Sequence, residues 1–261
     1  MIPRTRAIII AALAAMLPVQ VLAQDAPRQQ DDSPRQVLFV GNSYFYYNNS
    51  LHNHVRRMAV EGLGVPLGDL DYRSITISGG SLAHHPIAHY LTPGAIGYDT
   101  PFDVVVLQGH SAAALSERRA DAFNEAVSAA SEQIEATGAQ VALYMTHAYG
   151  DGHKDFAADN TDQIADLYTA AGEAAGAVVI PVGLAFAEAQ RRDPDLVLHQ
   201  TYDDSHPNVN GSYLAAATVY ATLYGKSPQG LEYDYYGAVE PEMRVFLQEV
   251  AADTVEALQA R

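Results

Sequence analysis

The chain is predicted to be an α/β protein, a three-layer α/β/α sandwich around a parallel five-stranded sheet. Short apolar runs alternate with longer helix-like segments through most of the sequence. The apolar runs are nearly continuous, which is typical of parallel strands covered on both faces. Right-handed crossovers between such strands place helices on both sides of the sheet. These observations together predict a doubly wound fold.

The strands are predicted from apolar or β-branched composition and from their flanking turn residues. The first, third and fourth are runs rich in Val and Leu, whereas the second alternates between apolar and polar residues. The five predicted strands are residues 37–40, 72–77, 104–107, 140–145 and 177–182.

The helices are predicted from apolar periodicity and from residues typical of helix ends. Ser116 is a candidate N-cap, and Gly62, Gly138 and Gly225 are candidate stops. The six predicted helices are residues 51–61, 116–137, 161–171, 184–192, 210–224 and 241–260.

The N-terminal residues 1–23 are typical of a secretory signal peptide. Arg4 and Arg6 form a basic start, residues 7–17 are apolar, and Val21-Leu22-Ala23 is a small-residue cleavage site. The apolar stretch is short for a transmembrane helix, although an uncleaved N-terminal anchor is the alternative. We therefore expect an exported protein, periplasmic or extracellular, with no stable membrane insertion after signal removal.

Residues 24–36 are polar and contain proline, so they are predicted to be a flexible leader. Residues 37–261 remain, about 225 in all, which is enough for a single α/β domain with a sizeable core. No internal repeat or second domain is evident. The oligomeric state is not predicted by the sequence.

The composition excludes several classes of function. The chain has 15 Lys and Arg against 31 Asp and Glu, a net charge of −16 at pH 7. Such a surface repels nucleic acid, so no nucleic-acid partner is expected. The chain has no cysteine, which excludes disulfides, thiolate metal sites and a cysteine nucleophile.

Two separated segments carry residue types suited to acyl transfer. The first predicted strand ends at Gly41-Asn42-Ser43, which places a hydroxyl at the carboxyl edge of the sheet. Near the end of the chain, Asp203 precedes His206 by three residues, and Pro207 restricts His206 to extended backbone. Ser43 as nucleophile, His206 as base and Asp203 as orienter would form a catalytic triad.

Each of these assignments has an alternative. A serine after a strand is often only a helix N-cap or a turn residue. Asp204 is the other carboxylate close to His206, and the Asp-Asp-Ser sequence is also typical of a surface turn. We favour Asp203, because Asp204 would need to fold back over one fewer residue.

Donors for a tetrahedral oxyanion are expected in the loop after the second strand. Gly79 and Gly80 lack a Cβ, so their backbone N–H groups allow close approach. The Ser43 N–H would be a second donor. A plain turn is the alternative interpretation of the two glycines.

Three segments in this order resemble the conserved blocks of the SGNH (GDSL-like) hydrolases. Phe39-Val40-Gly41-Asn42-Ser43 resembles the first block, Ser78-Gly79-Gly80 the second, and Asp203-Asp204-Ser205-His206 the last. The resemblance implies a flavodoxin-like α/β/α fold and ester hydrolysis without a cofactor or metal. It implies Ser43 as nucleophile and oxyanion donor, Gly80 or Gly79 as a further donor, and Asp203 and His206 as the other triad members.

The third block of that family departs from its usual pattern here. The family has Gly-x-Asn-Asp, whose Asn donates to the oxyanion, whereas this chain has Gln108-Gly109-His110-Ser111. Gln108 has the matching amide, and Ser111 occupies the Asn position in the Gly109 register. This loop resembles the acetylesterase branch of the superfamily, which acts on acetylated sugars.

Several histidines raise the alternative of a metal-assisted hydrolase. His85 and His89 are four residues apart, but they are not part of a His-Glu-x-x-His pattern. We expect these histidines to be solvated or hydrogen-bonded, and some to line a pocket with Tyr44, Tyr46 and Tyr149.

The leading hypothesis is an exported serine esterase that removes small acyl groups, with acetyl favoured, from a small-molecule or carbohydrate ester. One alternative is a catalytically decayed carbohydrate-binding protein with the same fold. The other is a lipase or thioesterase acting on longer acyl esters.

Overall fold

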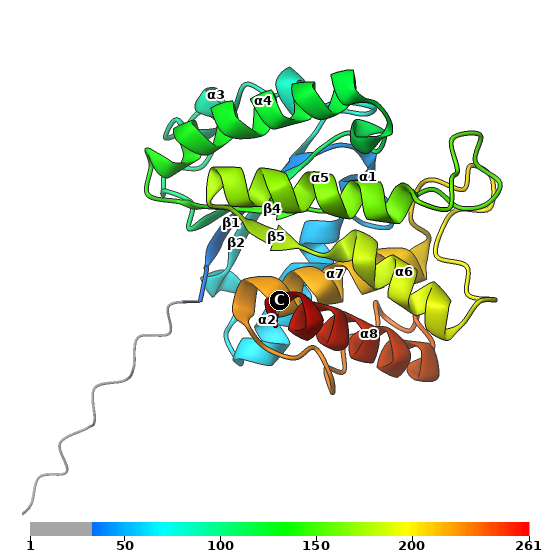
Figure 1. Cartoon of the computed structure of the whole chain (residues 1–261). Coiled ribbons are helices and arrows are strands. Elements are labelled where there is room, and N and C mark those ends of the chain that lie inside the picture. Colours follow the sequence, from blue (N-terminus) through cyan, green and yellow to red (C-terminus); the bar gives the residue numbers. More distant parts are fainter. Residues whose placement is uncertain (1–32, 261) are drawn as a thin grey trace, which may run out of the picture. The chain divides into compact units, whose positions relative to one another are not determined.

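The computed structural model describes residues 33–260, so the predicted signal peptide and most of the predicted leader lie outside the described residues. A parallel five-stranded sheet in the order β2-β1-β3-β4-β5 forms the centre of this part (Figure 1). This order is that of flavodoxin-like sheets. The strands are β1 Gln36–Gly41, β2 Asp71–Thr76, β3 Val104–Gln108, β4 Gln140–Tyr144 and β5 Val178–Ile180. The predicted fold class is confirmed.

All six predicted helices are present, with ends that differ from the prediction by at most four residues. The described part also contains short helices α1 and α3, which periodicity did not predict because each covers little more than one turn. No helix within residues 33–260 combines the length and hydropathy needed to cross a bilayer. The helices are α1 Ser43–Tyr46, α2 Leu51–Leu63, α3 Ile87–Leu91, α4 Glu117–Glu135, α5 Asn160–Ala175, α6 Val182–Arg192, α7 Val209–Tyr224 and α8 Pro241–Gln259.

The continuous apolar strands bury both of their faces. On β1, Val37 and Phe39 belong to the core beneath α2, α6, α7 and α8, whereas Leu38 and Val40 belong to the core beneath α3, α4 and α5. These helices form the layers on the two sides of the sheet in Figure 1. Alternate side chains therefore pack in opposite directions, as the pleat of a strand requires.

The predicted leader ends earlier than expected. The Asp103 carboxylate accepts hydrogen bonds from the backbone N–H of Arg35 at 2.6 Å and of Gln36 at 2.8 Å. Arg35 C=O also accepts from the N–H of Asp71. These bonds to neighbouring strands fix the chain before residue 37, so β1 begins at Gln36.

The sheet order places the carboxyl ends of β1 and β3 side by side. The chain leaves β1 toward β2 on one side and returns to form β3 on the other, which makes this the topological switch point. Residues following β1 and β3 therefore meet at one edge. The loop with Asp203 and His206 follows α6, and an isolated bridge between His199 and Pro207 stabilises it.

A pair of side-chain amides joins β1 to β3 at this edge. Gln108 Oε1 accepts from the Asn42 N–H at 3.0 Å, and Gln108 Nε2 donates to Asn42 Oδ1 at 2.8 Å. The second Gln108 N–H donates to Gly109 C=O at 2.8 Å. Gly41 leaves room for this pair, because a Cβ there would lie 2.5 Å from Gln108 Oε1.

The substitution Gln108→Met is expected to lower the free energy of unfolding by about 1–3 kcal/mol, because the Asn42 N–H would be buried without an acceptor. Urea denaturation measures the change. Gln140→Met is the matched control, since the Gln140 side chain is exposed at the start of β4. An unchanged free energy of unfolding would show that the amide pair between Asn42 and Gln108 does not stabilise the fold.

Four histidines are buried in the domain: His54, His85, His147 and His199. Burial lowers the pKa of each one, and the pKa of His147 lies well below the usual value. A neutral imidazole takes up a proton when unfolding exposes it to water at acidic pH. Acidification therefore favours the unfolded chain.

The free energy of unfolding should accordingly fall between pH 7.5 and pH 5.5. The loss begins as the pH drops below about 6.5, the unfolded value, and His147 alone should contribute on the order of 1 kcal/mol at pH 5.5. Urea denaturation at both pH values tests this. His147→Gln should weaken the pH dependence, whereas His89→Gln, at an exposed position, should leave it unchanged. Equal stability at both pH values would contradict the explanation.

Candidate active site

Ser43 is the first residue of α1, directly after the β1–β3 amide pair. Asn42 is the N-cap of this short helix, and its Oδ1 accepts from the Tyr44 N–H at 3.2 Å. Because Asn42 supplies the cap, the Ser43 hydroxyl is free for another partner. Ser43 is buried, with 8% of its surface exposed.

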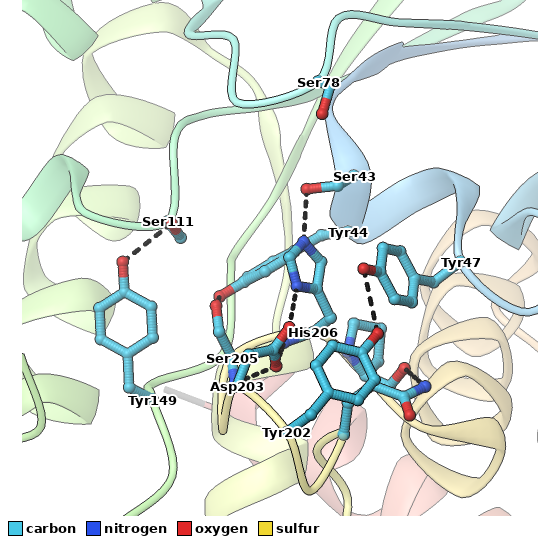
Figure 2. A network of polar contacts seen from close by, with 12 residues as sticks. Ser43, Tyr44, Tyr47, Ser78, Ser111, Tyr149, Tyr202, Asp203, Ser205 and His206 are labelled. Atoms are coloured by element: carbon cyan, nitrogen blue, oxygen red, sulfur yellow. Dashed lines mark hydrogen bonds and ion pairs between the residues drawn. The ribbon is translucent and has the colours of Figure 1, made fainter. Parts of the chain in front are cut away.

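The Ser43 hydroxyl forms a hydrogen-bonded series with His206 and Asp203 (Figure 2). Ser43 Oγ lies 2.7 Å from His206 Nε2, and His206 Nδ1 lies 2.6 Å from Asp203 Oδ2. Because a carboxylate can only accept, Nδ1 carries the imidazole hydrogen and Nε2 accepts the hydrogen of Ser43. The structure thus brings together side chains that are 163 residues apart in sequence.

Asp203 is held as an anion beside the imidazole. Its Oδ1 accepts from the backbone N–H of Ser205 at 2.9 Å and of His206 at 3.0 Å. Partial burial acts to raise the pKa of Asp203, but these bonds and the bond from the His206 ring outweigh it and lower the pKa. Asp204, the alternative carboxylate, has left-handed backbone and lies beside Gly150 and Gly152.

Backbone and side-chain bonds fix the segment that bears His206. The His206 C=O accepts from the Gln200 N–H at 2.7 Å. Pro207 C=O accepts from Asn48 Nδ2 at 2.9 Å, and Asn208 caps α7 by accepting from the Gly211 N–H. The base is therefore anchored to the turn between α1 and α2 as well as to its own loop.

Aromatic rings enclose the imidazole of His206. Tyr47 stacks on it with ring centroids 4.2 Å apart and planes 13° apart, while Tyr44 meets it edge-on at 5.6 Å. Behind Tyr44, His147 is stacked between Tyr44 at 4.3 Å and Phe186 at 4.2 Å. These contacts leave the imidazole little freedom to rotate.

In the loop after β2, one of the two glycine N–H groups has no acceptor among the described residues. The Gly80 N–H donates to Ile77 C=O at 2.9 Å and so closes a turn, in which Gly79 has a φ of +64°. The Gly80 N–H is therefore not available to an oxyanion, contrary to one of the two options that we expected. No acceptor in residues 33–260 engages the N–H of Gly79 or of Ser43, so these two remain free.

Gln108 does not have the role that its amide chemistry suggested. Both of its N–H hydrogens are used, by Asn42 Oδ1 and Gly109 C=O, and the residue is 1% exposed. The prediction of Gln108 as an oxyanion donor is therefore wrong. Ser111 accepts from the Tyr149 hydroxyl at 2.9 Å and keeps its own hydrogen, so its part in the site stays a prediction (Figure 2).

The buried histidines His54, His85, His147 and His199 are hydrogen-bonded within the fold. His85 Nε2 donates to Gly41 C=O at 3.0 Å, and His147 Nε2 donates to Ser205 C=O at 2.9 Å. Within residues 33–260, no group of three or more His, Cys, Asp or Glu side chains is arranged to hold a metal ion.

Two structural residues of the site were missed in the sequence. Tyr47 was not singled out, although it follows Ser43 by four residues in a tyrosine-rich run. Asn42 was considered only as the residue before the nucleophile. Its Nδ2 donates to Gly80 C=O at 3.0 Å and Gly109 C=O at 3.2 Å, which ties the two neighbouring loops together.

Comparison with known proteins finds solved structures of similar fold, but no similar family model or curated protein. No protein-family model and no curated protein matches the chain. Among solved structures, a DUF4886 family protein from Bacteroides uniformis is similar at 18% identity with a TM-score of 0.64, over 84% of this chain and 94% of that one.

Two further neighbours have more informative descriptions. A putative SGNH hydrolase from Slackia heliotrinireducens is similar at 24% identity with a TM-score of 0.58, over 72% of this chain and 97% of that one. An acetyl xylan esterase is similar at 16% identity with a TM-score of 0.56, over 71% of this chain and 98% of that one. The chain therefore has the fold of the SGNH (GDSL-like) hydrolases.

Proposed function

We propose that the protein is an exported serine esterase that removes small acyl groups, with acetyl groups on carbohydrate as the preferred class. The observation that carries the proposal is the Ser43–His206–Asp203 series, with hydrogen-bond distances of 2.7 and 2.6 Å. Its geometry is that of a nucleophile, a general base and an orienting carboxylate. The basic start and apolar run at the N-terminus support export.

The reaction proceeds in two acyl-transfer steps. Ser43 Oγ attacks the ester carbonyl while His206 Nε2 takes the hydroxyl proton, and Asp203 stabilises the resulting imidazolium. When the tetrahedral intermediate collapses, His206 gives this proton to the departing alcohol. Water then attacks the acyl-enzyme with His206 again as the base, which releases the acid and restores Ser43.

Charge on the tetrahedral oxygen needs donors that are already in place. The free N–H groups of Ser43 and Gly79 fill this role, and each well-placed donor contributes roughly 3 kcal/mol to transition-state stabilisation. Tyr46 supports the arrangement, because its hydroxyl lies 3.0 Å from Ser78 Oγ in the turn that contains Gly79.

Two features support an acetylated carbohydrate as the substrate. One solved neighbour is described as an acetyl xylan esterase. In addition, Tyr46 and Tyr202 are exposed beside the triad, at 41% and 69%, and exposed tyrosine rings suit the apolar faces of sugars. Longer acyl esters are the rival substrate class.

Ser43→Ala is expected to lower kcat for p-nitrophenyl acetate by at least about 10³-fold, because no other group forms the acyl-enzyme. A fluorophosphonate probe should label the parent protein and not the variant. A parent that hydrolyses no ester and resists the probe would favour the decayed carbohydrate-binding alternative. A variant as active as the parent would remove Ser43 from the mechanism.

Asp203→Asn is expected to lower kcat by about 10³ to 10⁴-fold, because the amide can no longer hold the imidazole in its productive tautomer. Asp204→Asn is the matched control, with the same chemical change one residue away, and should remain close to parental activity. Steady-state kinetics on p-nitrophenyl acetate measures both. Equal losses in the two variants would contradict the assignment of Asp203.

A further inference from the structure

A polar cavity of about 230 Å³ lies between the start of α2 and the loop that joins α7 to α8. It contains two guanidinium groups, two side-chain amides and two tyrosines, which together offer many donors and no carboxylate. These lining residues are Asn49, Asn53, Arg56, Arg57, Tyr233 and Tyr236.

The two arginines are unusual in so acidic a chain. Neither Arg56 nor Arg57 forms an ion pair within residues 33–260, although the whole protein has a net charge of −16. Arg56 Nη2 donates to Leu67 C=O at 2.7 Å, but its Nε is buried without an acceptor. Glu61, one turn further along α2, forms no ion pair with either arginine, and its carboxylate accepts from the N–H groups of Glu232 and Tyr233. Both guanidinium groups of the cavity are therefore without an ion-pair partner in the described residues.

The walls of the cavity adopt backbone conformations that bulky residues avoid. Asn49 has a φ of 69° and Tyr236 a φ of 59°, both in the left-handed region. Bonds from the Gly237 N–H to Asp234 Oδ1 and from the Val239 N–H to Asp234 C=O hold the loop in this form. Tyr236 is 76% exposed at the rim. Such backbone strain is typical of functional sites.

The same turn that lines the cavity also contacts the catalytic base. Tyr47 stacks on His206, and two residues later Asn49 lines the cavity. Between them, Asn48 Nδ2 donates to Pro207 C=O, and Asn48 C=O accepts from His54 Nε2 at 2.6 Å. His54 Nδ1 in turn accepts from the hydroxyl of Tyr233, a cavity residue, at 2.9 Å. A ligand in the cavity would therefore lie next to elements that hold His206.

We propose that this cavity binds the carboxylate-bearing sugar of an acidic, acetylated polysaccharide. Guanidinium groups match a carboxylate in charge and geometry, and the exposed ring of Tyr236 suits the apolar face of a pyranose. The amides of Asn49 and Asn53 suit sugar hydroxyls. The inference rests on the proposed esterase function for its substrate class, but binding at the cavity does not require an active triad.

The test compares two non-acetylated oligoxylosides by isothermal titration calorimetry, one with a glucuronic acid branch and one without. Because neither has an ester, binding is measured without turnover. The acidic oligosaccharide should bind about tenfold more tightly than the neutral one, as expected for one charge-assisted contact. Arg57→Gln should abolish this difference. Arg118→Gln, which removes an exposed arginine from α4, should preserve it.

A kinetic arm separates this proposal from the esterase proposal. Arg57→Gln should raise KM for acetylated glucuronoxylan with little change in kcat, and should leave p-nitrophenyl acetate hydrolysis unchanged. If the parent protein hydrolyses no ester, the esterase proposal is overturned, but the calorimetric test of the cavity proposal still stands. Equal binding of the two oligosaccharides would overturn the cavity proposal, and so would inorganic phosphate binding as tightly as the acidic one.

Discussion

The reciprocal bonding between the side chain of Gln108 and Asn42 is the constraint on which the candidate site depends. It joins the ends of β1 and β3 where the sheet topology switches, directly before Ser43. Asn42 Nδ2 extends the connection to Gly80 C=O and Gly109 C=O. Asn42 therefore sets the position of Ser43, of the turn with the free Gly79 N–H and of the loop after β3. Fully satisfied buried amides resist deformation, because any displacement leaves a polar group unpaired.

The base is held by a different kind of interaction. His206 comes from a loop after α6, far from any strand in sequence. The rings of Tyr47 and Tyr44 define the plane of its imidazole. Asn48 connects this loop to the turn after α1 through Pro207 C=O. Ser43, the proposed nucleophile, thus belongs to a rigid sheet edge, while His206, the proposed base, depends on packing between a loop and the segment that follows Ser43.

Much of the architecture is predictable because parallel strands buried on both faces leave continuous apolar runs. The hydrogen-bonded series of Ser43, His206 and Asp203 is also predictable, since Asp203 and His206 are three residues apart and Pro207 limits their geometry. The role of Gln108 was not predictable, because both of its N–H groups are engaged by residues whose positions the fold determines. The same holds for the choice between Gly79 and Gly80, which depends on the bond that closes the turn at Ile77. Tyr47 was missed because a tyrosine near a serine is equally common in ordinary packing.

The rings around His206 also bear on where a proton can go. A general base must take the proton of Ser43 and keep it until the alcohol leaves, so a competing acceptor nearby would be harmful. His147 is the imidazole on the far side of Tyr44, and burial lowers its pKa well below the usual value. Its Nε2 hydrogen is already committed to Ser205 C=O. Protonation of His147 is therefore unfavourable, and it acts as a neutral support for the loop. Asp203, with a lowered pKa and three donors, is an equally poor acceptor. In the proposed mechanism, the proton from Ser43 would therefore stay on His206, next to the position from which the alcohol departs.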